Sequence, residues 1–212
     1  MLKKKKTTAS GKLVLVKSVR RTRSHRMIFC VGIYSAIYFV IMMIVAMLGV
    51  VPVLYPTLVV FVPLIGGIPF MLFLTKVKKF GMIWIMSILM GILMVVCGMG
   101  YYALIVGVVT GLLAEFVFKS GKYNNTGKAI LTCGVFGLWV WGNYLQLFID
   151  REAFFSSPTR QGLGEDFINT INTLLPAWMC PVMLVICLVC GILGGLLGKK
   201  LLKKHFSKAG IV

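Results

Sequence analysis

Acidic residues are scarce in this chain, which has only five Asp and Glu among its 212 residues against 23 Lys and Arg. Histidine is scarcer still, because the only two, His25 and His205, lie in basic segments. An intramembrane metalloprotease needs an H-E-x-x-H motif or a cluster of Glu and His as metal ligands. This sequence offers no such ligands for a catalytic metal. A nucleophile–base pair is missing as well. We therefore expect no enzymatic activity and no cofactor.

A nucleotide-binding loop is also missing. The segment from Gly121 to Lys128 has one residue too many between its glycines, and Ala129 follows the lysine where Ser or Thr is required. The segment 194–199 also lacks the spacing that a nucleotide-binding loop requires. Any energy that the protein uses must therefore come from elsewhere.

Apolar sequence is what the chain has in abundance, with 59% hydrophobic residues and a mean hydropathy of +0.95. A soluble nucleic-acid-binding protein could carry a net charge of +18 but not this composition, so nucleic acid is excluded as a partner. A membrane span needs about 20 apolar residues, and the uncharged stretches supply six. We expect an all-α integral membrane protein with a six-helix bundle over residues 27–204. The expected spans are 27–49, 57–75, 80–97, 101–118, 129–149 and 174–198, with a hinge between the third and fourth near Gly98 and Gly100.

The bases and acids are segregated along the chain in a pattern that predicts its orientation. Of the 23 bases, 21 lie in four clusters, in the tail 1–26, at 76–79, at 119–128 and at 199–208. Only Arg151 and Arg160 lie in the loop 150–173, which also holds four of the five acids. Basic loops face the cytoplasm. We therefore expect a bacterial cell-membrane protein with cytoplasmic termini, the tail 205–212 included, and with this loop outside.

Glu115 is the only ionisable residue deep in an expected span. Proton-coupled transporters usually keep such a residue near the middle of the bilayer. Glu115 lies one helical turn before Lys119, at the cytoplasmic end of its span. The favoured interpretation is that its carboxylate reaches outward and pairs with Lys119 or Lys122.

Small residues recur at the spacing that lets membrane helices approach closely. For the fourth and sixth spans we expect packing inside the bundle. In the first span, the Gly32 to Ala36 pair could equally meet another protein. The residues of the fourth and sixth spans are Gly107, Gly111, Gly191, Gly194, Gly195 and Gly198.

Aromatic and amide side chains gather at the expected external ends of the last three spans. An amide within a span is costly unless it bonds to another helix or lines a wet cavity, and this favours a binding cavity over a simple interfacial belt of aromatic residues. The candidate substrate-binding residues are Tyr101, Tyr102, Trp141, Asn143, Tyr144, Gln146, Asp150, Arg151 and Trp178.

Two segments carry a resemblance to a known family: IGGIPFMLFLTKVKKFG at 65–81 and GLLGKKLLKKHFSKAGIV at 195–212. The chain resembles the MptD-type (Trep_Strep) S components of energy-coupling-factor (ECF) transporters, from about residue 27 to the C-terminus. The resemblance implies a six-helix membrane subunit that captures a micronutrient and pairs with a transmembrane coupling subunit and two ATPase subunits. It also implies that an Ala-x-x-x-Ala face of the first helix meets the coupling subunit. Here the nearest match is Gly32 and Ala36, extended by Ser35, so the family pattern is not fully kept.

The sequence therefore predicts the substrate-binding membrane subunit of an ECF-type ABC importer. The alternative is a stand-alone secondary transporter or channel for a small solute, in which a Gln at position 115 should abolish transport. A vitamin-like compound, a nucleobase and a tetrapyrrole all stay open as substrates.

Overall fold

The computed structural model describes residues 29–76, 79–156, 162 and 164–208, without the side chains of 204–208. The predicted basic tail 1–26 lies outside the described residues. A first helix runs from Phe29 and ends in a short 3-10 segment, η1. The elements that follow along the chain are η1 (Met47–Val50), α2 (Leu58–Lys76), α3 (Met82–Val96), α4 (Tyr102–Ser120), α5 (Thr126–Gly137), α6 (Trp139–Ile149), α7 (Arg151–Phe155), α8 (Glu165–Leu174) and α9 (Met179–Lys208).

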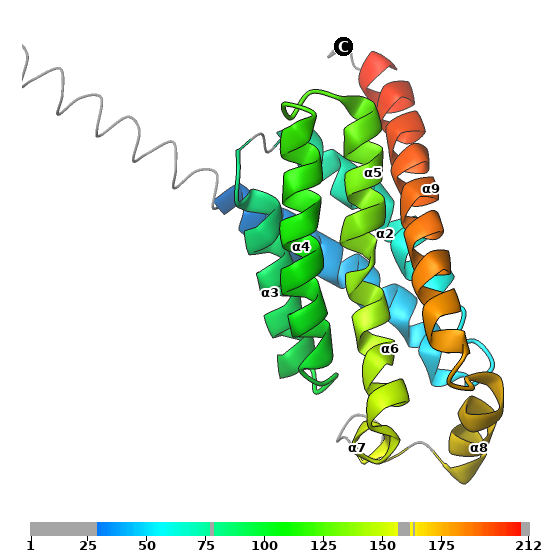
Figure 1. Cartoon of the computed structure of the whole chain (residues 1–212). Coiled ribbons are helices and arrows are strands. Elements are labelled where there is room, and N and C mark those ends of the chain that lie inside the picture. Colours follow the sequence, from blue (N-terminus) through cyan, green and yellow to red (C-terminus); the bar gives the residue numbers. More distant parts are fainter. Residues whose placement is uncertain (1–28, 77–78, 157–161, 163, 209–212) are drawn as a thin grey trace, which may run out of the picture.

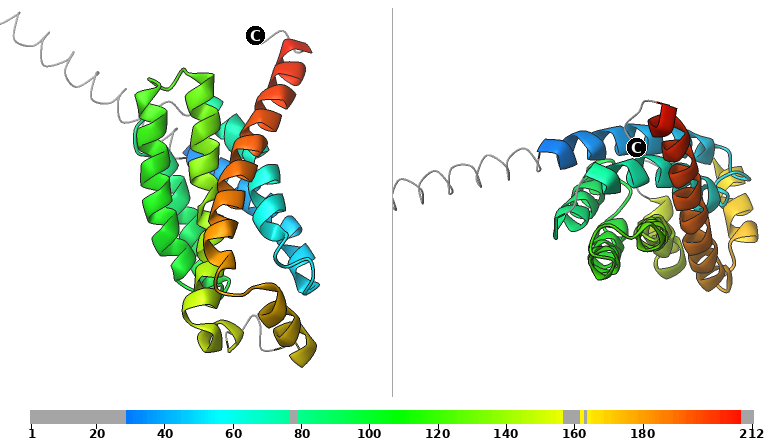
Figure 2. Two further views of the ribbon diagram at one scale, coloured as in Figure 1. Left: turned by 45° about the vertical axis from the view of Figure 1, so that its right-hand side comes forward. Right: turned by 90° about the horizontal axis from the view of Figure 1, so that it is seen from above.

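The helices form one bundle with two chemically different ends (Figure 1). Helices α4, α5 with α6, and α9 run alongside one another, while the first helix crosses obliquely behind them. The left view of Figure 2 shows α7 and α8 together at one end, opposite the last turns of α9. We call these the loop end, which carries α7 and α8, and the basic end, where α2 stops at Lys76 and α9 carries Lys199, Lys200 and Lys203.

Four helices among the described residues are long and apolar enough to cross a membrane: Phe29–Val50, Leu58–Lys76, Tyr102–Ser120 and Met179–Lys203. Helix α3 is apolar but has only 15 residues. The predicted span 129–149 is divided at Leu138 between α5 and α6, of 12 and 11 residues. The chain is thus a multi-pass helical protein, and the count of six spans stays a prediction.

The last predicted span begins later than expected. Residues 165–174 form the separate amphipathic helix α8, and α9 starts only at Met179. The predicted external loop 150–173 is therefore largely helical where it is described. By contrast, the expected hinge between the third and fourth spans is present, because Gly98 and Gly100 have φ of 75° and 86°, a conformation that favours glycine.

Glycines of α9 set the distance between α2 and α9. This agrees with the close packing inside the bundle that the glycine spacing of the sixth span predicted. A Cβ at Gly194 would lie 2.5 Å from the carbonyl oxygen of Pro63, and one at Gly198 would lie 3.0 Å from that of Gly67. In the same way, Gly111 of α4 packs directly against Ser87 of α3. The glycine pairs of the fourth and sixth spans thus pack inside the bundle.

Glu115 does not reach outward, so the expectation of a pair with Lys119 or Lys122 was wrong. Its side chain is fully buried, and its Oε2 accepts a hydrogen bond of 2.9 Å from the backbone N–H of Ile83. The first amides of a helix need an acceptor, and the residue that precedes α3, Gly81, has no side chain to provide one. Glu115 therefore caps α3 from a neighbouring helix. Lys119 instead lies over the ring of Phe80, with its Nζ 4.8 Å from the ring centroid.

Candidate ligand-binding site

A cavity of about 190 Å³ lies near the loop end, between the first helix, the start of α2, the end of α3, α6 and α8. Its walls are mostly apolar, with three methionines and four aromatic rings. The lining residues are Met42, Ala46, Gly49, Val50, Tyr55, Leu58, Val62, Met94, Met99, Trp139, Val140, Asn143, Tyr144 and Phe167. A small apolar cavity with a few polar groups is the usual form of a small-molecule site.

Most of the polar groups around this cavity are already hydrogen-bonded within the protein. The Tyr144 hydroxyl donates to the backbone oxygen of Tyr55 at 2.7 Å, and the indole N–H of Trp139 donates to the Tyr38 hydroxyl at 3.3 Å. Asn143 differs from them. Its Oδ1 is shielded from solvent and accepts no hydrogen bond from any described residue, although its Nδ2 lies 3.5 Å from the Val140 oxygen.

The orientation of Asn143 follows from the packing of α6 on α4. Gly142 lies directly against α4, since a Cβ at this position would come 2.8 Å from Val106 and 3.2 Å from Ala103. This contact holds one face of α6 on α4. Positions 139, 140 and 143 then share the face that lines the cavity, because residues three and four apart are neighbours on a helix.

Gln146, the second amide of the expected pair, does not line the cavity. It is buried, and its Oε1 lies against Gly100 in the hinge between α3 and α4, with no hydrogen-bond partner among the described residues. The two amides, three residues apart in α6, thus meet different surroundings. Only Asn143 faces the cavity.

Four of the predicted aromatic residues lie elsewhere. Tyr101 and Tyr102 stack on each other with ring centroids 4.5 Å apart. Tyr101 and Trp178 are 57% and 66% exposed, as expected for an interfacial belt. The Trp141 indole N–H donates to the backbone oxygen of Cys180 at 2.9 Å and so joins α6 to α9.

Asp150 and Arg151 organise the loop end without touching the cavity. The Asp150 carboxylate caps α7 by accepting from the Ala153 N–H at 3.0 Å. The Arg151 guanidinium donates to Asn172 Oδ1 at 2.7 Å and to the backbone oxygen of Leu175. These bonds fasten the end of α8 to α7.

The lining residues that the sequence reasoning missed include Tyr55, Phe167 and the three methionines. Phe167 is brought in by α8, where its ring centroid lies 5.9 Å from that of Tyr55. Tyr55 lies in the turn before α2, between two prolines. The amphipathic pattern of 165–174 and an aromatic residue in a turn were the available signals.

The first helix presents an apolar face to its surroundings. Gly32 and Ala36 lie on this exposed face beside Ile33 and Ile37, and an added Cβ at Gly32 would meet nothing within 4 Å. Ser35 faces the bundle instead and is fully buried. The small-residue face therefore consists of Gly32 and Ala36 without Ser35.

In the described part of the chain, four helices long and apolar enough to cross a membrane, with many exposed large hydrophobic side chains, define a multi-pass integral membrane protein. Residues 26–208 match the family described as hypothetical bacterial integral membrane protein (Trep_Strep), and the chain belongs to this family. No curated protein and no solved structure matches the chain.

Proposed function

We propose that this protein is the substrate-binding membrane subunit of an ECF-type ABC importer, with six spans and both termini in the cytoplasm. The loop end then faces outward and captures a small micronutrient. The basic end faces the cytoplasm, in keeping with the positive-inside rule. The absence of a nucleotide-binding loop in the sequence requires energy from partners, which are the coupling subunit and two ATPase subunits.

The observation that carries the proposal is the cavity near the loop end, whose wall includes Asn143 with a buried Oδ1 that accepts no hydrogen bond from a described residue. A buried acceptor without a donor costs about 1–3 kcal/mol. A bound molecule that donates an N–H or O–H would remove this cost. We propose that the ligand completes the bonding of this oxygen.

The cavity also narrows the class of substrate. Its 190 Å³ lies below the roughly 300–1,000 Å³ of pockets for drug-sized ligands, which suits a single-ring compound better than a tetrapyrrole. No described residue that lines it is charged, so a neutral molecule fits best. The rings of Trp139, Tyr144 and Phe167 favour a planar one. A vitamin-like compound or a nucleobase meets these conditions.

The first helix supports the partner part of the proposal. Its exposed face around Gly32 and Ala36 lets another helix approach closely, as small residues do in membranes. This face lies on the side of the first helix that no described helix covers. A coupling subunit would cover it.

The test is to co-express the chain with a coupling subunit and ATPases of the same host, purify the complex and identify the released ligand by mass spectrometry. Asn143→Leu keeps the side-chain size but removes the acceptor. We expect it to weaken binding of the identified ligand at least tenfold. Asn169→Leu, on the exposed face of α8, is the matched control and should bind like the wild type. Equal affinity of all three proteins would exclude the cavity as the binding site.

A stand-alone secondary transporter is the second candidate, and the fully buried Glu115 within α4 favours it. Its carboxylate, however, is engaged in capping α3. Uptake by the isolated chain in vesicles, lost in Glu115→Gln, would support this candidate over the importer subunit.

A further inference from the structure

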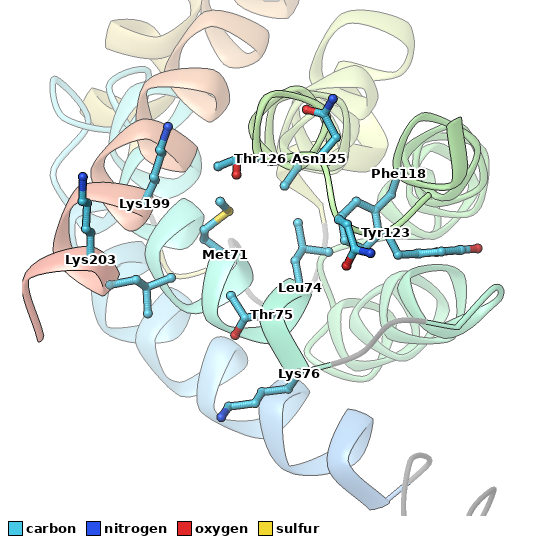
Figure 3. Close-up of a pocket in the computed structure, with 13 residues that line it drawn as sticks. Met71, Leu74, Thr75, Lys76, Phe118, Tyr123, Asn125, Thr126, Lys199 and Lys203 are labelled. Carbon is cyan, nitrogen blue, oxygen red and sulfur yellow. The ribbon is translucent and has the colours of Figure 1, made fainter. Parts of the chain in front are cut away.

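A second and larger cavity, of about 720 Å³, opens at the basic end (Figure 3). It lies between α2, the turn that joins α4 to α5, the start of α5, and α9. Figure 3 shows Lys199 and Lys203 extending from α9 on one side and Asn125, Thr126 and Tyr123 on the other. It is separate from the cavity near the loop end and shares no lining residue with it.

Three lysines border this cavity and no acid does, among the described residues. Lys199 and Lys203 are four residues apart and thus on one face of α9, while Lys76 ends α2. Four of the five acids of the chain lie in the segment 150–166. The fifth, Glu115, is used to cap α3. No carboxylate of a described residue therefore lines the cavity beside Lys199 and Lys203.

The wall opposite the lysines is polar and firmly held. The Asn125 side chain accepts hydrogen bonds from Gly127 and Lys128 at 2.9 and 3.2 Å, so it occupies the first amides of α5. The ring of Tyr123 packs edge-on against Phe118, with centroids 5.2 Å apart. Lys199 and Lys203 are then the charged groups that an anion would meet on the other side.

The floor of the cavity is apolar, formed in part by Met71, Leu74 and Leu202. Two candidate membrane spans, Leu58–Lys76 and Met179–Lys203, end here, so the cavity lies at the level where lipid headgroups meet acyl chains. A ligand that suits it has an anionic group toward the lysines and an apolar part toward the floor.

We propose that this cavity binds the phosphate group of an anionic phospholipid headgroup from the leaflet at the basic end. The phosphate lies beside Lys199 and Lys203, and the glycerol and upper acyl chain lie against Leu74 and Leu202. Lysine is a common phosphate ligand as a point charge, and anionic lipids attract bases at the membrane surface. The site is independent of the proposed transport function and of the ligand bound near Asn143.

The experiment uses the full chain, purified in detergent and stripped of lipid, and measures bound lipid by native mass spectrometry. Phosphatidylglycerol and phosphatidylcholine with the same acyl chains are compared. We expect the wild type to retain phosphatidylglycerol at least tenfold more tightly. The double variant Lys199→Gln and Lys203→Gln should lose at least tenfold in affinity, and Lys76→Gln should lose less.

The matched control is the double variant Lys119→Gln and Lys200→Gln, which removes the same charge from exposed positions outside the cavity. It should bind phosphatidylglycerol within twofold of the wild type. Equal losses in both double variants, or equal retention of the two lipids, would overturn the proposal. If an acidic segment of a partner is the true occupant, the chain should retain the two lipids equally well.

Glycerol 3-phosphate distinguishes the source of the phosphate. We expect it to displace phosphatidylglycerol only at concentrations at least a hundredfold above the lipid, because it lacks the apolar part. If it competes at equal concentration and the lysine variants abolish that competition, the lipid assignment is wrong and a soluble phosphate compound is the ligand.

Discussion

Replacing Gly194 of α9 with Ala should destabilise the bundle strongly for a change of one methyl group. The added Cβ would lie 2.5 Å from the backbone oxygen of Pro63 and 2.6 Å from that of Leu64. Both are backbone atoms of α2, so neither can turn away as a side chain would. The two helices must separate instead, and this weakens the dispersion contacts along their whole crossing.

The size of the effect follows from two opposing contributions. Alanine in place of glycine favours the helix by up to about 1 kcal/mol. Overpacking a dense interior costs about 1–3 kcal/mol, and the clash with two backbone oxygens places this case at the upper end. The free energy of unfolding should fall by about 2 kcal/mol. For a chain of this length, that corresponds to a decrease in Tm of about 4–8 °C.

The assay is thermal unfolding in detergent, followed by a thiol-reactive fluorophore. Cys133 and Cys187 are 3% and 0% exposed, so they react only when α5 and α9 separate. The control is Gly32→Ala, because its added Cβ meets nothing within 4 Å. Its Tm should match or slightly exceed that of the wild type.

A Gly194→Ala protein with a Tm within 1 °C of the wild type would show that α2 and α9 do not cross as closely as the structure has them. A decrease of equal size in Gly32→Ala would also refute the reasoning. In that case glycine would be favoured for a reason other than close helix approach.

Three further predictions concern the candidate residues. Glu115→Gln should retain ligand binding, because the amide oxygen still accepts from Ile83, whereas Glu115→Leu should lower stability by about 1–3 kcal/mol, measured by thermal unfolding. Tyr101→Ala and Trp178→Ala should keep the ligand affinity within twofold of the wild type in equilibrium binding, because both side chains are exposed. A tenfold loss would show that these side chains bind the ligand. Arg151→Ala should release α8 from α7 and speed proteolysis at the loop end severalfold, with unchanged digestion as the contradicting result.

The glycine spacing of α4 and α9 predicted internal packing, and the Gly98 to Gly100 hinge was also expected from the sequence. Both depend on local features, because spacing along a helix and glycine in a turn are properties of a short segment. The partner of Glu115 was missed for the opposite reason. Ile83 is 32 residues away, and no local pattern indicates which distant side chain caps α3.

The candidate site shows the same division. The sequence indicated amides and aromatic residues near the external ends of the later spans. It did not separate Asn143, which lines the cavity, from Gln146, which packs at the hinge, since both are polar and lie on the same helix. It also missed Phe167, because α8 was expected to be part of a loop or the start of the last span.

By itself the sequence determined that this chain is a multi-pass membrane protein and that its charges divide into basic segments and one acidic loop. Composition and the order of charges along the chain carry that information directly. The tertiary structure alone decided which side chains meet. The contact of Gly142 with α4 sets the rotation of α6, and that rotation turns Asn143 toward a cavity that four other helices complete. Contacts of this kind depend on packing between segments that are far apart in the sequence, and no single segment specifies that packing.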